Sequence, residues 1–318
     1  MTKKLNFSLT QLEYIMAVHK FGHFAKAAEA CNVTQPTLSM QIHKLEEDLG
    51  VTIFDRSKKP ILLTTAGQLL IDQFKSVLFE AKKIDELIKT SQSDHAGGEL
   101  ILGIIPTVAP YILPLLLPTL SDRYPGISLQ IMEMQTHKII EALNSDEIDV
   151  GLLATPIQIN KIIEYPLYFE PFSVYCHKKH PLNQLKKIKY SNLDNQDIWL
   201  LEEGHCLRNQ ILDVCNLKKS KTQKKQFQFE SGSIETLKKL VSSFGGYTLV
   251  PELAISEENV HSNYISFDRP IPARQIGLVY RREHYKIELI ENLGEAIIQS
   301  IPEHIRKLRQ KDLDVLPI

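Results

Sequence analysis

Residues 27–50 read AAEACNVTQPTLSMQIHKLEEDLG, and this stretch decides how the N-terminal part of the chain folds. Thr34 suits the N-cap of a helix, and Pro36 suits its first turn, where a missing N–H costs nothing. Large apolar residues then recur four, three and four positions apart, at Leu38, Ile42, Leu45 and Leu49. Residues with this spacing stack on one helical face, so the stretch predicts a helix that buries one side and exposes the other.

The exposed side of this helix predicts contacts with DNA bases. Its N-terminal half is small and uncharged, which would allow it to enter a major groove. Gln35, Thr37 and Ser39 offer hydrogen bonds to base edges, and Met40 offers an apolar contact for a thymine methyl group. The full predicted DNA-facing set on this helix is Thr34, Gln35, Pro36, Thr37, Ser39, Met40, His43 and Lys44.

The flanking residues extend the helix into a small domain. Residues 8–11 form a capping-box pattern that predicts a first helix, and residues 24–30 predict a second. After Gly50 the residues alternate as in a short hairpin, with cations at its tip that suit DNA phosphates: Arg56, Lys58 and Lys59. The spacing also allows a plain three-helix bundle with a solvated basic loop.

A long motif in this region resembles the signature of the LysR-type regulators. It comprises Ala27, Ala28, Val33 to Ser39, Gln41, Ile42, Leu45, Glu46, Leu49, Gly50, Phe54, Arg56, Leu63, Thr64, Ala66 and Gly67. The resemblance implies a winged helix-turn-helix that binds double-stranded DNA as a dimer reading two half-sites. We expect this DNA-binding domain to span residues 1–64.

A long helix over residues 65–95 is expected to follow as a dimerisation linker. Its apolar residues are separated by 4, 3, 4, 3 and 4 positions, at Leu70, Phe74, Val77, Ala81, Ile84 and Ile88. This is a heptad spacing, which is typical of a coiled coil. A helix with such a stripe could instead pack on its own domain.

Residues 96–310 predict an α/β regulatory domain, because apolar runs alternate there with helical stretches. Predicted strands are 100–105, 128–134, 149–153, 167–175, 198–201, 248–250 and 276–280, and predicted helices are 111–124, 137–143 and 289–301. The LysR-type resemblance implies two lobes like those of periplasmic binding proteins, about 97–170 plus 273–310 and 171–272. The chain is then expected to cross between lobes near 170–171 and 271–272, with a ligand cleft between them.

Three hydroxyl residues are candidates for that cleft. Thr107 and Thr136 each follow a predicted strand, at the strand ends where α/β sheets collect ligands. Ser233 begins a helix after residues 229–232. The sequence alone equally allows all three hydroxyls to be helix caps.

The segment EEGHCLRNQILDVC, residues 202–215, predicts a reactive thiol. A loop ending at Gly204 leads into a helix beginning near Cys206, where the helix N-terminus, His205 and Arg208 would favour a thiolate. Cys215 is nine residues on, roughly 13 Å away along a continuous helix, too far for a disulfide without unwinding. The alternative is that these thiols are small hydrophobic residues, as we interpret Cys31 and Cys176.

The sensor segment resembles the peroxide-sensing branch of the LysR-type family, and this resemblance covers essentially the whole chain. The motifs are residues 204–208 with the second cysteine, 105–107, 135–137 and 276–281. The resemblance implies that Cys206 is the peroxidatic cysteine and Cys215 its resolving partner. It also implies the residues around the peroxide or effector: Thr107, Thr136, His205, Arg208, Asn209, Ser233 and Arg274. Asn209 stands where the branch often has an acidic residue that helps move a proton, and this departure bears on the rate of oxidation. Residues 243–247 depart from the usual glycine-rich turn of the branch.

Composition bounds the remaining function classes. The 318 residues are 43% hydrophobic with a net charge of −1, so DNA binding must rest on a local surface. No apolar run reaches the length of a signal peptide or membrane span, and four cysteines are too few for a secreted disulfide scaffold. We therefore expect a cytoplasmic, nucleoid-associated protein with no membrane partner, no cofactor and no metal site.

The partners implied by the resemblance are promoter DNA, hydrogen peroxide, RNA polymerase and further copies of the chain as a homodimer or homotetramer. Two other functions stay open. One is a LysR-type regulator that binds a small metabolite in the inter-lobe cleft and carries its cysteines incidentally. The other is a thiol peroxidase, although a DNA-binding half favours a regulator over an enzyme.

Overall fold

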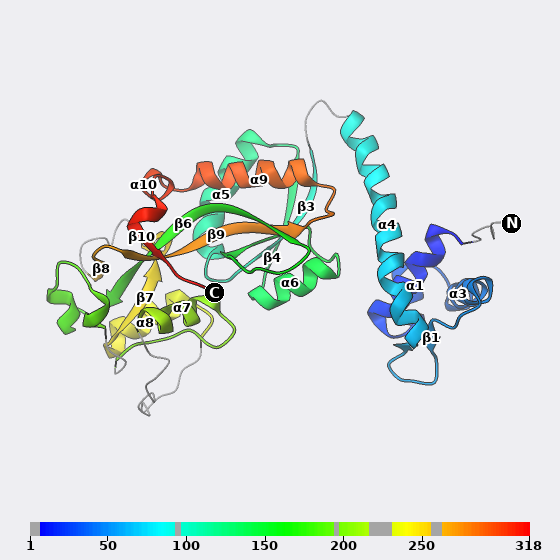
Figure 1. The fold of residues 1–318 in the computed structure, drawn as a ribbon, viewed down its shortest axis with the longest axis horizontal. Coiled ribbons are helices and arrows are strands. Elements are labelled where there is room, and N and C mark those ends of the chain that lie inside the picture. Colours follow the sequence, from blue (N-terminus) through cyan, green and yellow to red (C-terminus); the bar gives the residue numbers. More distant parts are fainter. Residues whose placement is uncertain (1–6, 93–96, 194–196, 216–230, 256–262) are drawn as a thin grey trace. The chain divides into compact units, whose positions relative to one another are not determined.

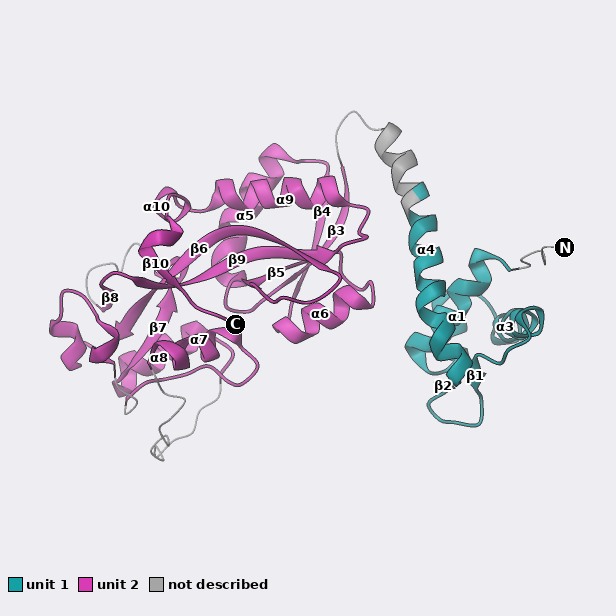
Figure 2. Ribbon diagram, viewed as in Figure 1, with its two compact units in different colours: residues 1–92 teal, residues 93–318 magenta. Residues whose placement is uncertain are grey.

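The computed structural model describes residues 7–92, 97–193, 197–215, 231–255 and 263–318, without the side chains of residues 83 and 85–92. It contains two compact units, residues 1–92 and 93–318 (Figure 2). The predicted seam residue Ile88 lies outside the described side chains. Among the residues described, no helix is both long enough and apolar enough to cross a membrane.

The first unit is a helical domain with a two-stranded hairpin. Its elements are α1 (Leu9–Phe21), α2 (Phe24–Ala30), α3 (Gln35–Leu49), β1 (Phe54–Asp55), β2 (Leu62–Leu63) and α4 (Thr65–Gln92). Ser8 caps α1 in the predicted capping box, and Thr34 accepts a hydrogen bond from the N–H of Thr37 at the start of α3. The antiparallel pairing of β1 with β2 forms the predicted hairpin after α3.

A buried carboxylate fixes this hairpin to α3. Glu46 is 7% exposed, and its Oε1 accepts hydrogen bonds from the N–H groups of Ile53 at 2.7 Å and Phe54 at 3.2 Å. Its Oε2 accepts a hydrogen bond from Arg56 at 2.9 Å. Gly67 at the start of α4 approaches the hairpin so closely that a Cβ there would lie 2.3 Å from the carbonyl oxygen of Ile53. These contacts hold the hairpin in a defined position beside α3.

The second unit is an α/β fold (Figure 1). Its strands are β3 (Gly98–Ile104), β4 (Ile127–Glu133), β5 (Val150–Thr155), β6 (Ile162–Cys176), β7 (Tyr247–Pro251), β8 (Tyr264–Ser266), β9 (Ile271–Arg281) and β10 (Leu313–Val315). Its α-helices are α5 (Ala109–Arg123), α6 (Thr136–Asn144), α7 (Cys206–Val214), α8 (Ile234–Phe244), α9 (Ile287–Ser300) and α10 (Glu303–Arg306). Short 3₁₀ helices occur at Pro181–Gln184, Tyr190–Asn192, Glu252–Ala254 and Gln310–Asp312.

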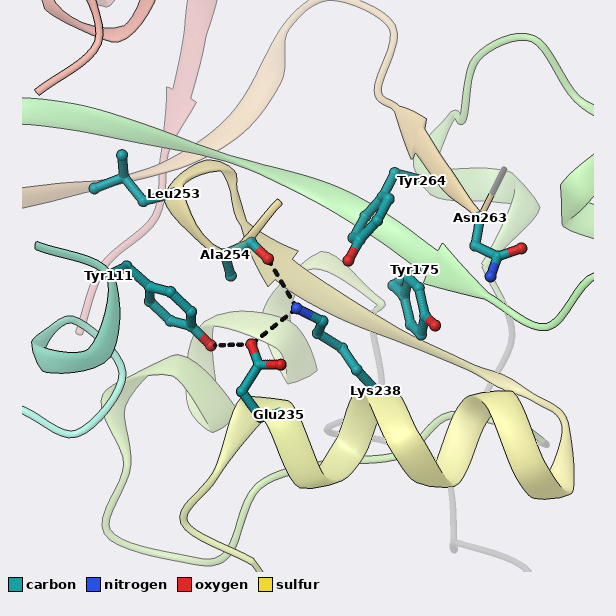
Figure 3. A pocket seen from close by; sticks show the side chains of 8 residues that line it. All are labelled: Tyr111, Tyr175, Glu235, Lys238, Leu253, Ala254, Asn263 and Tyr264. Carbon is teal, nitrogen blue, oxygen red and sulfur yellow. Dashed lines mark hydrogen bonds and ion pairs between the residues drawn. The ribbon is translucent and has the colours of Figure 1, made fainter. Parts of the chain in front are cut away.

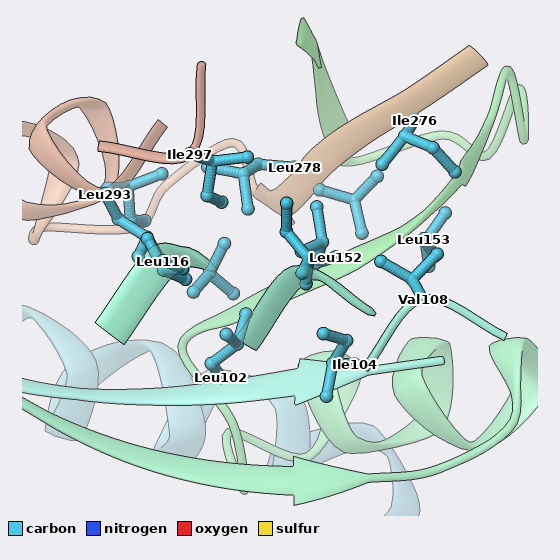
Figure 4. Packing of buried hydrophobic residues seen from close by; sticks show 14 of the residues in the cluster. Leu102, Ile104, Val108, Leu116, Leu152, Leu153, Ile276, Leu278, Leu293 and Ile297 are labelled. Carbon is cyan, nitrogen blue, oxygen red and sulfur yellow. The ribbon is translucent and has the colours of Figure 1, made fainter. Parts of the chain in front are cut away.

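Two long strands carry the chain between two hydrophobic cores. The strand order is β4-β3-β5-β9-β6-β7, and β6 runs antiparallel to β9. One core lies around β3, β5, α5 and α9 and includes Leu102, Leu152 and Leu293 (Figure 4). The other lies around β7, α7 and α8 and includes Phe172 and Leu249. Residues of β6 and β9 belong to both cores, so the two lobes are joined through this strand pair.

Most of the strands predicted for this unit are observed, within a few residues of their expected ends. The strand predicted at 198–201 is wrong, because Ile198 makes only an isolated bridge with Tyr247. The backbone of Trp199 is held there by Tyr247 O at 2.8 Å and by the Thr248 hydroxyl at 2.8 Å. At the C-terminus β10 pairs in parallel with β9, which brings residues beyond 310 into this sheet.

Candidate functional site

Cys206 is the first residue of α7, and its thiol faces the other lobe. The sulfur lies 3.3 Å from the hydroxyl of Thr136, the first residue of α6. Helix α6 packs on the first core through Ile139, whereas α7 packs on the second core through Leu207. The reactive-thiol candidate therefore stands at the junction of the lobes, next to Thr136, which the sequence analysis names as a candidate for the cleft.

A buried arginine at the connection between the lobes is held by groups from two other segments. Arg274 of β9 is 1% exposed, and its Nε donates to Glu170 Oε2 of β6 at 2.8 Å. Its Nη1 donates to the Thr107 hydroxyl at 2.9 Å, and its Nη2 donates to the Thr107 carbonyl at 3.0 Å. Glu170 and Arg274 are register partners at the point where the strand pair passes between the lobes. Thr107 and Arg274, both predicted site residues, thus form one buried cluster.

A cavity of about 490 Å³ opens between the lobes. Its lining residues are Pro106, Pro110, Tyr111, Glu133, Met134, Gln135, Lys138, Glu202, His205, Ser231, Gly232, Ser233, Ile234 and Glu235. His205 is buried, with Nε2 3.4 Å from Glu202 Oε1. Ser233 caps α8 by accepting a hydrogen bond from the N–H of Thr236 at 3.4 Å. The predicted residues His205 and Ser233 therefore line the inter-lobe cavity.

Two other predicted site residues, Arg208 and Asn209, do not line this cavity. Arg208 donates from Nη1 to the carbonyl of Leu201 at 2.6 Å, so its guanidinium is engaged by the loop before α7. Asn209 is exposed on α7. The contact found for the Cys206 sulfur is with the Thr136 hydroxyl.

The four thiols differ in their surroundings. Cys206 is partly exposed, whereas Cys215 is 7% exposed and forms the C-cap of α7 within the second core. The two residues occupy opposite ends of one helix, roughly 13 Å apart along its axis at 1.5 Å per residue. Burial raises the pKa of Cys176 to about 11. Burial, followed by the charge of Glu13, raises the pKa of Cys31, so both outlying thiols are disfavoured as thiolates.

Sequence reasoning missed three buried polar groups in this region. Glu170 is the partner of Arg274, and its role as a counter-ion depends on a contact 104 residues away in sequence. The hydroxyl of Tyr168 and the amide of Gln210 are buried without a hydrogen-bond partner among the residues that the structure describes. Gln210 follows Cys206 by four residues on α7, on the buried face of that helix.

A second cavity of about 320 Å³ lies next to the first (Figure 3). The Tyr111 hydroxyl donates to Glu235 at 2.9 Å, and Lys238 donates to the same carboxylate at 2.8 Å and to the Ala254 carbonyl at 2.9 Å. Figure 3 marks these three contacts with dashed lines. Burial, followed by the charge of Glu235, raises the pKa of the Tyr111 hydroxyl well above its usual value. Tyr111 and Glu235 line both cavities, so their hydrogen bond lies between the two cavities. The same hydrogen bond connects α5 to α8.

The predicted base-reading face of α3 is exposed in the first unit. Gln35, Pro36 and Thr37 are exposed, Ser39 is partly exposed, and Met40 is 62% exposed. His43 and Lys44 continue the exposed face, and His43 lies 3.3 Å from Glu47. A polar surface with one apolar side chain therefore projects from α3.

The hairpin cations are not equivalent. Lys58 and Lys59 are exposed, whereas Arg56 pairs with Glu46 and lies over the Phe24 ring at 5.1 Å from its centroid. Arg56 thus has a role in holding the hairpin, in addition to the phosphate contact that the sequence predicts.

The predicted seam on α4 divides into two parts. Phe74 is 6% exposed and packs into the core of the first unit together with Ile71. Val77 and Ile84 are 39% and 61% exposed. Among the predicted seam residues with described side chains, the exposed apolar ones therefore lie after Phe74, because Leu70 and Phe74 pack against the core of the first unit.

Comparisons with known proteins identify both parts of the chain. Residues 9–68 match the lysR-family bacterial regulatory helix-turn-helix proteins, and residues 93–301 match the LysR substrate binding domain. A hydrogen peroxide-inducible genes activator of Haemophilus influenzae is 38% identical over 303 residues, covering 95% of this chain and 98% of that protein. The DNA-binding transcriptional dual regulator OxyR of Escherichia coli is 36% identical with the same coverage.

Solved structures give the same result. A full-length OxyR from Pseudomonas aeruginosa with a cysteine-to-aspartate substitution has a TM-score of 0.77 and 32% identity, covering 96% of this chain and 99% of that one. A hydrogen peroxide-bound cysteine-to-serine mutant of Corynebacterium glutamicum OxyR has a TM-score of 0.61 and 32% identity, with 93% of each chain covered.

Proposed function

Because the chain belongs to the LysR family and, within it, to the OxyR group of hydrogen peroxide-inducible activators, we propose that it binds promoter DNA and activates transcription when peroxide oxidises Cys206. The observation that carries the site assignment is the contact of the Cys206 sulfur with Thr136 across the lobe junction. A thiol in this position can signal its oxidation to both lobes.

The proposed reaction has two steps. The Cys206 thiolate attacks one peroxide oxygen, the O–O bond breaks, and hydroxide leaves and takes up a proton to become water. The product is a sulfenic acid, which the Cys215 thiol attacks to form a disulfide and release a second water. Since a disulfide needs Cα atoms within about 7 Å, α7 must unwind before the second step can finish.

The residues around the thiol have proposed roles in the first step. Thr136 contacts the sulfur, and Thr107 with Arg274 supplies donors that would bind peroxide oxygens. His205 and Ser233 line the approach from the cavity. We assign Arg208 and Asn209 to positioning this loop and helix rather than to a direct contact.

The test of this function is thiol mapping by mass spectrometry after one equivalent of peroxide, combined with operator footprinting. We expect a bond between Cys206 and Cys215 and a changed footprint. A footprint that responds to a small metabolite but not to the thiols would favour the alternative regulator, for which the cavity of about 490 Å³ is the supporting observation. Sustained peroxide turnover with a reductant would instead indicate a peroxidase.

On DNA, we expect base-reading and phosphate-binding residues to behave differently. Gln35→Ala with Ser39→Ala should reduce discrimination between operator and random DNA, because both residues lie on the face of α3 that we propose to read base edges. Lys58→Ala should weaken binding to all sequences and flatten its salt dependence, since it removes a phosphate contact. Fluorescence anisotropy at several salt concentrations measures both, and unchanged selectivity of the double variant would exclude the groove assignment.

We propose that the chain forms a dimer through α4 and a tetramer through its regulatory units, and that it contacts RNA polymerase at promoters. Because a regulator of chromosomal genes must reach its DNA, we also propose that it acts in the cytoplasm, at the nucleoid. The exposed apolar surface at Val77 and Ile84 is the support for the α4 contact.

For the dimer, Val77→Asp with Ile84→Asp is expected to weaken association strongly, because charges would face each other across an apolar seam. Phe74→Asp is a poor probe, since Phe74 belongs to the core of the first unit and its loss would unfold that unit. Sedimentation and operator affinity measure the effect, with Lys82→Asp on an exposed position of α4 as the control. Unchanged association of the double variant would show that another surface holds the dimer.

A further inference from the structure

The C-terminal residues pass from one lobe to the other. Helix α10 packs on the first core through Ile305, which is 1% exposed, and Leu308 packs against the same core. Further along the chain, Leu316 is 6% exposed and belongs to the second core. The segment from Ile305 to Leu316 therefore has an apolar anchor in each lobe, and its last residues lie beyond the end that the sequence predicts for the regulatory domain.

Strand β10 joins the sheet at the point where the lobes are connected. It pairs in parallel with the Ile271–Ala273 end of β9, and the N–H of Leu316 donates to Ala273 O at 2.9 Å. The other edge of β9 is paired with β6 there, through Pro171↔Ala273, and β5 pairs with β9 only from Gln275 onward. The connection is thus three strands wide at this point, and a third strand stabilises a pair that is marginal by itself.

A polar contact also fixes β10 to the second lobe. The hydroxyl of Tyr190 donates to Asp314 Oδ2 at 2.7 Å, and the Tyr190 ring meets Phe267 edge-on with 5.8 Å between centroids. Burial, followed by this hydrogen bond, raises the pKa of the Tyr190 hydroxyl above its usual value, so the group keeps its proton at neutral pH. A hydrogen bond to a charged acceptor is one of the stronger kinds. The position of β10 is therefore set by both apolar and polar contacts.

We propose that residues 303–316 form a strap that fixes the orientation of the two lobes and thereby keeps the Cys206 sulfur in contact with Thr136. The β6–β9 pair is one joint, about which the lobes could still bend. Bending would draw Ile305 or Leu316 out of its core, and exposing an apolar side chain to water is unfavourable. This inference concerns the lobes alone and does not require Cys206 to react with peroxide.

The test measures the alkylation rate of individual thiols by iodoacetamide in the reduced full-length protein, with mass spectrometry to assign each site. Cys206 reports the lobe junction, whereas Cys176 and Cys215 report the second core. In Leu316→Ala we expect the Cys206 rate to rise about threefold to tenfold, because the sulfur leaves Thr136 and becomes more accessible. The rates of Cys176 and Cys215 should stay within about twofold, because their core remains folded.

Two further variants make the test specific. Ile318→Ala shortens another apolar side chain of the same tail, but Ile318 is 37% exposed, so this control should change none of the rates. Tyr190→Phe removes the hydroxyl that binds Asp314 and keeps the ring in the second core. It should raise the Cys206 rate in the same direction as Leu316→Ala, by a smaller factor.

Each outcome decides the proposal. An unchanged Cys206 rate in both Leu316→Ala and Tyr190→Phe would overturn it, because the lobes would then keep their orientation without the strap. If Leu316→Ala raises the rates of all three thiols, the second core has been damaged, and Tyr190→Phe decides. A rise at Cys206 alone in that variant supports the strap, and any other pattern means that β10 only stabilises the second lobe.

Discussion

Cys206→Ser is expected to abolish the response of this protein to hydrogen peroxide. Cys215→Ser is expected to react once with peroxide but not to form the disulfide. Serine lacks a nucleophilic thiolate, so the first variant cannot begin the reaction. The second variant keeps Cys206 at the lobe junction but lacks the thiol that would capture the sulfenic acid. Dimedone labelling with mass spectrometry should find a persistent sulfenic acid in Cys215→Ser and none in Cys206→Ser.

The same experiment tests the conformational part of the mechanism. In the wild type, oxidation should make the α7 segment accessible to protease and change the operator footprint at the same time. The driving force is sufficient, since a two-electron couple gains about 1.4 kcal/mol for each 30 mV of potential difference. A helix of nine residues is marginal by itself, so the main cost of unwinding α7 is the loss of the packing of Leu207, Ile211 and Val214 on the second core. A disulfide from Cys206 to Cys31 or Cys176, or a 206–215 bond that changes neither readout, would contradict the mechanism.

Glu170→Met is expected to destabilise the regulatory unit by about 3 to 5 kcal/mol, because it leaves the charge of the Arg274 guanidinium buried without its counter-ion. Both side chains are 1% exposed, and Nη2 of Arg274 lies 2.7 Å from Glu170 Oε2. Urea unfolding followed by the fluorescence of Trp199, the chain's one tryptophan, reports this unit.

The matched control is the double variant Glu170→Met with Arg274→Met, which removes both charges together. It should recover most of the lost stability, since well-packed apolar residues often replace a buried ion pair at little cost. Its peroxide reaction should nevertheless stay slow, because the Arg274 donor to Thr107 is gone. Equal stability of Glu170→Met and the wild type would mean that the pair is hydrated rather than buried.

The features that the sequence predicts best are those set by neighbouring residues. The capping box at Ser8, the helix at Phe24–Ala30 and the cap at Thr34 depend on side chains within three or four positions, and all are observed. Strand patterns likewise located β3, β4 and β5 within about two residues, because the buried β5 is a nearly continuous apolar run, whereas β4 alternates apolar and polar residues.

The rest depends on contacts between distant segments. Thr136 and Cys206 are 70 residues apart, and the pairing of Glu170 with Arg274 follows from strand register rather than from any local motif. The burial of Phe74 shows the same limit, because a heptad spacing does not specify which helix the stripe faces. The sequence therefore predicts candidate residues for the site, whereas the contacts between these residues depend on tertiary packing.

The strand pair β6 and β9 has a mechanical consequence for signalling. Two separate connections would allow the lobes to rotate about a hinge. Here the two strands pair with each other from Ile162↔Arg281 to Pro171↔Ala273. A hydrogen-bonded pair of strands moves as one unit and resists twisting. The ion pair of Glu170 with Arg274 and the hydrogen bond of Tyr111 with Glu235 add further contacts at the connection between the lobes. We therefore expect little signalling by opening and closing of the lobes. A change in the conformation of one short segment, α7, would carry the signal more readily.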